Sequence, residues 1–277
     1  MKFGKYDVRT VLFGRFRLDG GAMFGSVPKN LWAKRIPADN ENCIPMAARA
    51  LLVRGEGRVV LVDVGLGEKW AEKPRKIFEI KNEPSEKLGF APESVTDIIL
   101  THLHFDHAGG ISRWKDAQKK EAELTYPKAK MWLQRSNFEN ARNPNPREQA
   151  SYLPENVFVL EQGDLTLVEG SREILPDLWV HRFDGHTVGQ QWIELRDGAR
   201  RIMYPADLVP TSHHLPVPFV MGYDMCASTA LHEKEEFLKR ALDEDALIVF
   251  EHDPAVAAAR IAKPAHYVVR ESFAALD

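Results

Sequence analysis

The sequence contains few cysteines and no long apolar segment. Only two of its 277 residues are cysteines, Cys43 and Cys226. They are too few for a disulfide framework or a four-cysteine zinc site, and we expect both to be buried, inert thiols. No run approaches the roughly 20 apolar residues of a membrane span, and Met1–Asp7 lacks the apolar core of a signal peptide. We therefore expect a cytoplasmic protein with no membrane partner.

Neither sign of charge dominates the sequence. It has 37 lysines and arginines against 40 aspartates and glutamates, a formal net charge of −3. Nucleic-acid affinity depends on a basic surface that neutralises phosphates, so we expect no nucleic-acid partner. The hydrophobic fraction of 44% is ordinary for a globular protein. No Pro/Gly/Ser-rich linker divides the chain, so the simplest interpretation is a single domain over residues 1–277.

Short apolar segments separated by turns predict a mixed α/β protein. A hairpin is expected where Ala47–Val53 and Arg58–Val64 flank a Gly-Glu-Gly turn. A helix is expected at about 228–242, with Ser228 or Thr229 as N-cap. Serial strands with interspersed helices favour two sheets packed together, with helices outside. Further strands are predicted at residues 6–18, 98–101, 130–133, 157–160, 178–183, 191–195, 201–204 and 246–250.

Four potential metal ligands occur within six residues: His102, His104, Asp106 and His107. Residues two apart in an extended segment point the same way, so His102 and His104 can face one point. Asp106 and His107 come where the chain leaves the strand and can serve a neighbouring point. Burying these groups without a metal is costly. The motif therefore predicts a metal site, with a solvated histidine-rich loop as the alternative.

Three further potential ligands each follow a predicted strand: His186, Asp207 and His252. Strand ends that converge at one edge of a sheet sandwich would gather these side chains into one cleft. Imidazole and carboxylate ligands suit zinc, and also iron, manganese or cobalt. We expect two divalent ions, with zinc as the first choice. A closed structural site is the alternative, although such sites are often rich in thiolates.

The order of these residues resembles the metallo-β-lactamase superfamily. The resemblance extends from about Asp63 to His252 and implies an αβ/βα four-layer sandwich, that is, an α/β (α+β) fold, with the metals at one edge of the sheets. Asp63 would contact a ligand histidine and fix its tautomer, with a plain turn residue as the alternative. The implied arrangement places His102, His104 and His186 on one metal, Asp106, His107 and His252 on the other, and Asp207 between the two.

The resemblance implies a hydrolase that uses a metal-bridging hydroxide. Two ions about 3.5–4 Å apart can share a hydroxide and lower the pKa of water towards ~7. Asp106 and Asp207 are the expected catalytic carboxylates, with Asp106 orienting the hydroxide or carrying a proton to the leaving group. Familiar zinc β-lactamases carry Cys at the Asp207 position. Thioesterases of the glyoxalase II type carry a C-terminal helical domain for which residues 253–277 are too few.

Compact dinuclear members remain, such as lactonases and hydrolases of the methyl-parathion type. The expected substrate is a small lactone or other ester, phosphotriesters included. Pro210 stands where well-known acyl-homoserine lactonases place a tyrosine, so substrate positioning is expected to differ. Segment Asp19–Lys29 also resembles this group, although a packed loop is the alternative. The substrate-pocket candidates are Met23, Phe24, Phe105, His213 and His214.

Three alternatives remain open. One is a mononuclear iron oxidoreductase of the persulfide-dioxygenase type, against which the complete second ligand set of Asp106, His107 and His252 argues. Another is a thioesterase of the glyoxalase II type. The third is a binding protein without catalysis. The physiological substrate and the oligomeric state stay open, with a homodimer among the choices.

Overall fold

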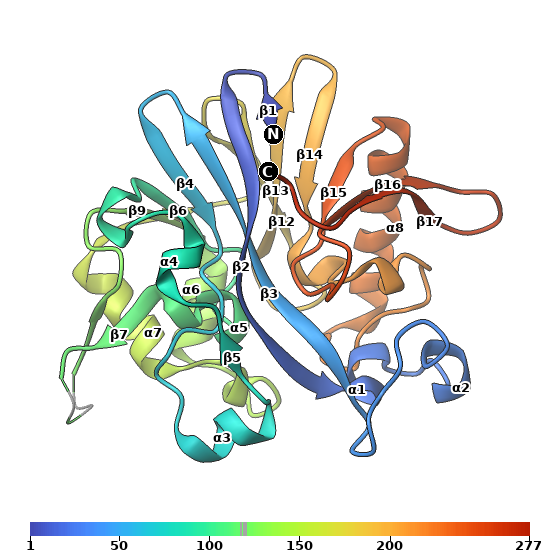
Figure 1. The fold of residues 1–277 in the computed structure, drawn as a ribbon, viewed down its shortest axis with the longest axis horizontal. Coiled ribbons are helices and arrows are strands. Elements are labelled where there is room, and N and C mark those ends of the chain that lie inside the picture. The colour runs from blue at the N-terminus through green and yellow to red at the C-terminus, as the bar shows by residue number, and fades with distance from the viewer. Residues whose placement is uncertain (117, 119–120) are drawn as a thin grey trace. The chain divides into compact units, whose positions relative to one another are not determined.

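The computed structural model describes residues 1–116, 118 and 121–277, which form two compact units (Figure 1). Unit 1 comprises Met1–Arg15, Ala48–Gly170 and Asp277, and unit 2 comprises Phe16–Ala47 and Ser171–Leu276. Two long strands, β2 (Tyr6–Asp19) and β3 (Cys43–Gly55), have residues in both units. The prediction of a single domain over residues 1–277 stays a prediction.

The first sheet has the strand order β1-β2-β3-β4-β6-β9-β10, with β5 paired to β2. Strands β4, β6, β9 and β10 pair in parallel with one another in this order, and the apolar residues of β4 and β6 suit burial on both faces. Besides β2 and β3, its strands are β1 (Lys2–Phe3), β4 (Arg58–Val62), β5 (Lys81–Asn82), β6 (Asp97–Ile99), β9 (Lys130–Gln134) and β10 (Asp164–Val168).

Helices and a small two-stranded sheet complete unit 1. Its apolar core includes Leu61, Ile98, Leu100 and Met131, all fully buried. The α-helices are α3 (Glu72–Ile77), α4 (Ser85–Leu88), α5 (Phe105–Ala108), α6 (Arg135–Arg142) and α7 (Pro154–Val159), and the small sheet pairs β7 (Ser112–Trp114) with β8 (Ala122–Leu124). Short 3-10 turns lie at Pro92–Ser94, Gly109–Ile111, Gln149–Ser151 and Leu160–Gln162.

Two sequence predictions in unit 1 have opposite outcomes. The predicted hairpin is confirmed as the antiparallel pair β3–β4. Its two-residue turn places Glu56 (φ 52°) and Gly57 (φ 72°) in the left-handed region, as tight hairpins require. The predicted strand at Val157–Leu160 is wrong, because its first residues belong to helix α7 and its last to the 3-10 turn that follows. Pro154 begins that helix, and a short apolar run alone cannot separate a buried helix from a strand.

Unit 2 is built on a seven-stranded sheet among the described residues, in the order β11-β12-β13-β14-β15-β16-β17. Only the pair β14–β15 is parallel. The strands are β11 (Arg172–Leu175), β12 (Leu178–Phe183), β13 (Gln190–Asp197), β14 (Arg200–Tyr204), β15 (Leu247–Val249), β16 (Ala258–Ala262) and β17 (Val268–Phe273). The helices are α1 (Gly20–Phe24), α2 (Lys29–Trp32) and α8 (Ala227–Asp243), with 3-10 turns at Ala206–Leu208 and Ser212–His214.

Helix α8 confirms the helix predicted at about 228–242, and it packs on the unit 2 core through Phe237, Leu238 and Ala241. The predicted N-cap is wrong, because Cys226 occupies that position without a side-chain cap. Cys226 is exposed and Cys43 is half-buried, so the expectation of two buried thiols is also wrong. Among the described residues, no helix combines the length and apolar character needed to cross a membrane.

Candidate metal centre

The motif of unit 1 leaves strand β6 in an extended conformation and then enters helix α5. The rings of His102 and His104 have centroids 4.4 Å apart. His107 lies on the helical turn, with its ring centroid 3.9 Å from that of His102, and its Nε2 is 3.9 Å from an Asp106 oxygen. All four side chains are buried. Unit 1 thus brings together the four residues expected from the motif.

A buried carboxylate and a hydroxyl orient two of these histidines. Asp63 accepts hydrogen bonds from the Thr101 amide and hydroxyl, both at 2.7 Å, and lies 3.1 Å from His107 Nδ1. Since the Thr101 hydroxyl donates to Asp63, it can accept from His102 Nδ1 at 3.1 Å. Nε2 is then the atom of each ring suited to a metal. Asp63 makes the contact expected of it, while Thr101 was missed although it directly precedes the motif.

Asp63 adopts this position through an uncommon backbone conformation, with φ at 59°. A left-handed residue other than glycine costs up to about 1–3 kcal/mol and persists only where the surroundings over-determine it, and such residues cluster at functional sites. The hydrogen bonds from Thr101 supply that constraint here. This geometry supports a role beyond that of an ordinary turn residue.

Glu148 lies against His104 on the other side of the cluster. Its buried carboxylate is 3.8 Å from His104 Nε2 and accepts hydrogen bonds from Asn140 and Asn145 at 2.9 and 2.8 Å. The ring of Tyr152 meets that of His104 edge-on at 4.9 Å. Sequence reasoning missed Glu148, because nothing local marks a glutamate 44 residues after its histidine.

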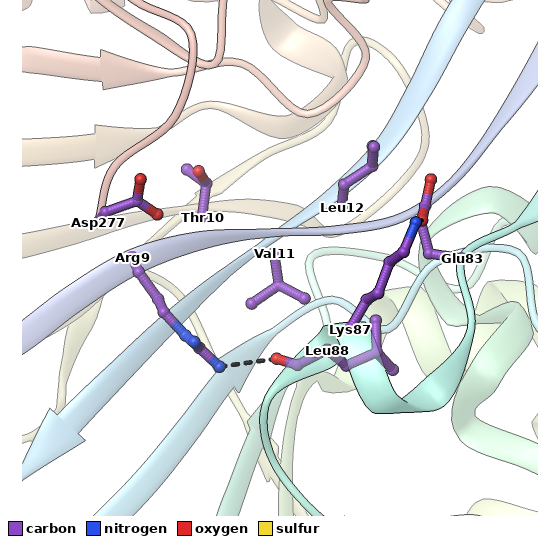
Figure 2. Close-up of a pocket in the computed structure, with 8 residues that line it drawn as sticks. All are labelled: Arg9, Thr10, Val11, Leu12, Glu83, Lys87, Leu88 and Asp277. Atoms are coloured by element: carbon purple, nitrogen blue, oxygen red, sulfur yellow. Dashed lines mark hydrogen bonds and ion pairs between the residues drawn. The ribbon is translucent and has the colours of Figure 1, made fainter.

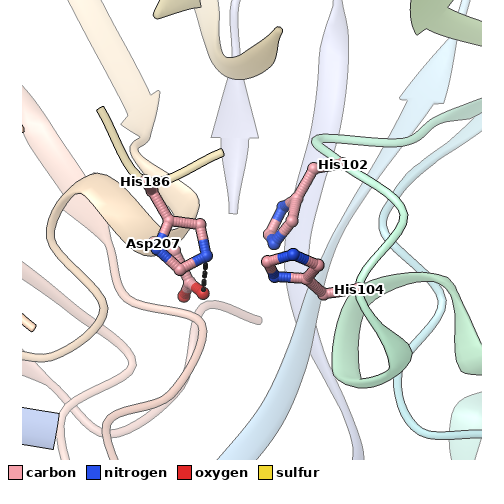
Figure 3. A group of neighbouring side chains, drawn as sticks. All are labelled: His102, His104, His186 and Asp207. Atoms are coloured by element: carbon pink, nitrogen blue, oxygen red, sulfur yellow. Dashed lines mark ion pairs between the residues drawn. The ribbon is translucent and has the colours of Figure 1, made fainter. Parts of the chain in front are cut away.

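In unit 2, one carboxylate contacts two histidines. Asp207 Oδ2 lies 3.1 Å from His186 Nε2 (Figure 3), and Oδ1 lies 3.1 Å from His252 Nε2. All three side chains are buried. The preceding residue, Ala206, has φ at 49°, so the turn that presents Asp207 is strained. Unit 2 thus brings together the three residues predicted from three strand ends, and Asp207 offers one oxygen to each histidine.

The outer ring nitrogens of these histidines are also engaged. Asp224 Oδ1 lies 2.9 Å from His186 Nδ1, and the Ala47 carbonyl lies 2.8 Å from His252 Nδ1. Burial lowers the pKa of His186, but the charges and hydrogen bonds of Asp207 and Asp224 outweigh burial and raise that pKa to about 10. This corner of unit 2 therefore stabilises positive charge, which a metal ion would also supply. Sequence reasoning missed Asp224.

Three of the substrate-pocket candidates are packed inside unit 2. Met23 and Phe24 are buried, and Phe24 stacks on His214 with ring centroids 4.4 Å apart. His214 contacts Thr211 Oγ1 at 2.7 Å through Nδ1 and the Met23 carbonyl at 2.9 Å through Nε2. Burial lowers the pKa of His214 to about 3, so its ring is neutral. His214 ties two loops together, which favours the packed-loop interpretation of segment Asp19–Lys29.

The other two pocket candidates are half-buried. Phe105, in unit 1, meets Trp70 and Phe78 with ring centroids 5.1 and 5.6 Å apart. His213, in unit 2, has its pKa lowered by burial. Their role as substrate contacts stays a prediction.

A recess of about 290 Å³ lies elsewhere in unit 1, beside β2 and α4 (Figure 2). Arg9 spans it and donates a hydrogen bond to the Leu88 carbonyl at 2.7 Å. No predicted site residue lines it, so the recess is separate from the ligand cluster of unit 1. Its lining residues are Arg9, Thr10, Val11, Leu12, Glu83, Lys87, Leu88 and Asp277.

Comparison with known sequences gives a consistent set of relatives. A family described as "Metallo-beta-lactamase superfamily" matches residues 44–252. An N-acyl homoserine lactonase from Bacillus sp. is 27% identical over 171 residues, 61% of this chain and 60% of the relative. The chain therefore matches less than two thirds of that relative's length. Acyl-coenzyme A thioesterase MBLAC2 from Gallus gallus is 28% identical over 174 residues, 58% of this chain and 57% of the relative.

Solved structures show similar folds over nearly the whole chain. A probable metal-dependent hydrolase from Staphylococcus aureus has a TM-score of 0.89 at 25% identity and covers 99% of this chain and 100% of its own. AidC, a dizinc quorum-quenching lactonase, has a TM-score of 0.79 at 22% identity and covers 99% and 97%. The first similarity includes both units, and the second concerns the fold alone.

Proposed function

Since the chain belongs to the metallo-beta-lactamase superfamily, we propose that it is a dinuclear metal-dependent hydrolase acting on a lactone or another small ester. The predictions of this family and of its mixed α/β fold class are confirmed by the matches over residues 44–252 and over nearly the whole chain. Zinc as the metal, the number of ions, the substrate, a cytoplasmic location and a homodimer stay predictions.

The arrangement around Asp207 carries the proposal. One buried carboxylate directs separate oxygens to two histidines, each at 3.1 Å, as a ligand shared by two cations would. We propose that the ligands of both units complete one centre. His102, His104 and His186 would hold one ion together with Asp207, and these four side chains are drawn in Figure 3. Asp106, His107 and His252 would hold the other.

The donor set fits divalent metal ions. It consists of imidazoles and carboxylates without thiolate, which suits zinc and its neighbours. In His102, His107, His186 and His252, Nδ1 contacts a hydroxyl, a carboxylate or a carbonyl. Such outer partners fix the tautomer of a metal-binding histidine. When bound, the ions would supply a nucleophilic hydroxide at neutral pH and polarise the scissile bond.

The protein's own groups would orient the substrate and move the proton. Asp106 is buried beside His107 and is proposed to carry a proton to the leaving oxygen. Pro210 stands at the position of the lactonase tyrosine, and its carbonyl accepts a hydrogen bond from the His252 amide at 3.0 Å. This residue therefore supports His252 through its backbone and offers no hydroxyl, so the acyl group would be held by other residues.

Metal analysis combined with a substrate panel tests the proposal. We expect two ions per chain, and hydrolysis of lactones or simple esters that EDTA abolishes and zinc or cobalt restores. Two bound ions without turnover of any lactone, ester, thioester or phosphotriester would contradict it. One iron per chain with oxygen uptake would favour the persulfide-dioxygenase type instead. Preference for acyl-coenzyme A would favour a thioesterase, to which the similarity with MBLAC2 points.

A further inference from the structure

Helix α8 carries two adjacent charged residues whose side chains contact unit 2 and are shielded from solvent. Lys234 is only 1% exposed and Glu233 is half-buried, whereas the next residue, Glu235, is exposed. Lysine is rarely buried unless its ammonium group is paired or hydrogen-bonded. Neither Glu233 nor Lys234 is a proposed metal ligand, so the burial of this pair has another cause.

Glu233 holds the backbone immediately before His186. Its two carboxylate oxygens accept hydrogen bonds from the amides of Asp184 and Gly185, at 2.8 and 2.9 Å. The helix lies against the same backbone, because a Cβ at Gly185 would be 2.3 Å from the Ala230 nitrogen. The side chain of Asp184 in turn accepts from the Gly189 amide at 2.7 Å. The segment 184–189, which presents His186, is thus fixed to α8.

Lys234 holds a second segment that also reaches His186. Its ammonium donates hydrogen bonds to the carbonyls of Pro216 and Phe219, at 3.1 and 2.6 Å. That loop continues to Asp224, whose carboxylate lies 2.9 Å from His186 Nδ1. Burial lowers the pKa of Lys234 to about 7, so the two carbonyl contacts offset only part of the cost of desolvation.

We propose that Glu233 and Lys234 are positioning residues for His186. Glu233 sets the backbone that carries the imidazole, and Lys234 sets the loop that carries its partner Asp224. The carboxylate of Glu233 accepts from amides and Nζ of Lys234 donates to carbonyls. Two adjacent residues of one helix therefore hold two separate segments. This inference rests on the proposed function where it concerns metal binding. The hydrogen bonds of Glu233 and Lys234 to the two segments do not depend on that function.

Hydrogen exchange of the metal-free chain tests directly whether Glu233 and Lys234 hold the two segments in place. We expect the amides of residues 184–189 to exchange about tenfold faster in Glu233→Gln, since glutamine replaces one of the two accepting oxygens with an NH2 donor that faces an N–H group. Residues 216–226 are expected to exchange faster in Lys234→Met. Glu235→Gln, the exposed neighbour on the same helix, should leave both segments unchanged. If Lys234→Met does not fold, Glu233→Gln still decides. Unchanged exchange in Glu233→Gln would overturn the inference.

Metal binding tests whether the contacts of Glu233 and Lys234 position His186. We expect zinc affinity, measured by competition with a chelator, to fall about 10–100-fold in Glu233→Gln and Lys234→Met. The visible absorption of the cobalt-loaded variants should also change, with Glu235→Gln as the control. Faster exchange with wild-type affinity and spectrum would make the pair merely structural and overturn its role towards His186. A wild-type chain that binds no metal would overturn the proposed function. The exchange experiment would still decide whether Glu233 and Lys234 hold the two segments.

Discussion

The two units assemble their candidate ligands in different ways. Unit 1 takes all of its ligands from residues 102–107, and the neighbouring Thr101 orients His102. Unit 2 takes its ligands from three separate strand ends, and Asp224, 38 residues further along, contacts His186. The carbonyl that contacts His252 belongs to Ala47, 205 residues away. The ligands of the first cluster are brought together by local chain geometry, and Asp63 and Glu148 contact two of them from distant segments. The ligands of the second cluster meet only through tertiary structure.

Removing the carboxylate of Asp207 should produce the largest effect on this comparison. We expect Asp207→Asn to lower kcat/KM by at least about 10²–10³-fold, as loss of one essential electrostatic group does. Its amide would offer only one oxygen where two are used. Metal content per chain and kcat/KM measure the result. The ligand geometry of unit 1 should persist. Loss of both ions would agree with one carboxylate shared by two sites, whereas wild-type metal content and kcat/KM would contradict that role.

The two orienting carboxylates offer a matched pair of substitutions. Asp63→Asn and Asp224→Asn should each weaken metal binding about 10–100-fold, because each contacts Nδ1 of a proposed ligand histidine. Asp63 also accepts two hydrogen bonds from Thr101 at full burial, whereas Asp224 accepts one further hydrogen bond, from the Met221 amide. Asp63→Asn should therefore also reduce the free energy of unfolding by about 1–3 kcal/mol. Chelator competition and urea unfolding of both variants measure this. Equal losses of stability would contradict the proposed difference.

Acid should act on a specific network of unit 2. Burial raises the pKa of Glu194, but hydrogen bonds from His181 and Arg196 and the charge of Arg240 outweigh burial and hold that pKa at about 2. Because the folded pKa lies below the usual glutamate value of 4.5, the carboxylate stabilises the fold fully above about pH 4.5. That contribution is lost as pH falls towards 2.

We expect Glu194→Gln to lower the free energy of unfolding by up to about 3 kcal/mol at pH 7. The difference from the wild-type chain should stay constant down to about pH 4.5 and then shrink, as followed by urea unfolding at several pH values. A difference that grew on acidification would reverse the assigned sign. Metal binding by unit 1 ligands should be unaffected, which makes the variant a control for the two carboxylates above.

The same contrast explains how much the sequence could predict. Residues 102–107 predict a metal site because such dense potential ligands after an apolar strand have few other uses, and the hairpin turn at Glu56-Gly57 is equally local. His186, Asp207 and His252 could be identified by their order, but Asp224 and Glu148 could not, since each meets its histidine only through the folding of a distant loop. The glycine-rich loop predicts a pocket role for Met23 and Phe24, and closeness to Asp207 in the sequence predicts one for His214. The structure packs these three residues together, and their role as substrate contacts stays a prediction.

The smallest expected effects concern two turns with left-handed backbone. Glu56, between β3 and β4 in unit 1, has φ at 52°, and Asp177, between β11 and β12 in unit 2, has φ at 62°. Glutamate is disfavoured in this region, whereas a short aspartate side chain tolerates it better. We therefore expect Glu56→Gly to stabilise the chain by about 0.5–1 kcal/mol and Asp177→Gly to give less. Thermal unfolding of the two variants provides the measurement. A larger gain in stability for Asp177→Gly would contradict this expectation. It would mean that tertiary contacts strain the turn of unit 2, as tertiary contacts also bring together the candidate ligands of that unit, while the turn of unit 1 follows from its local sequence.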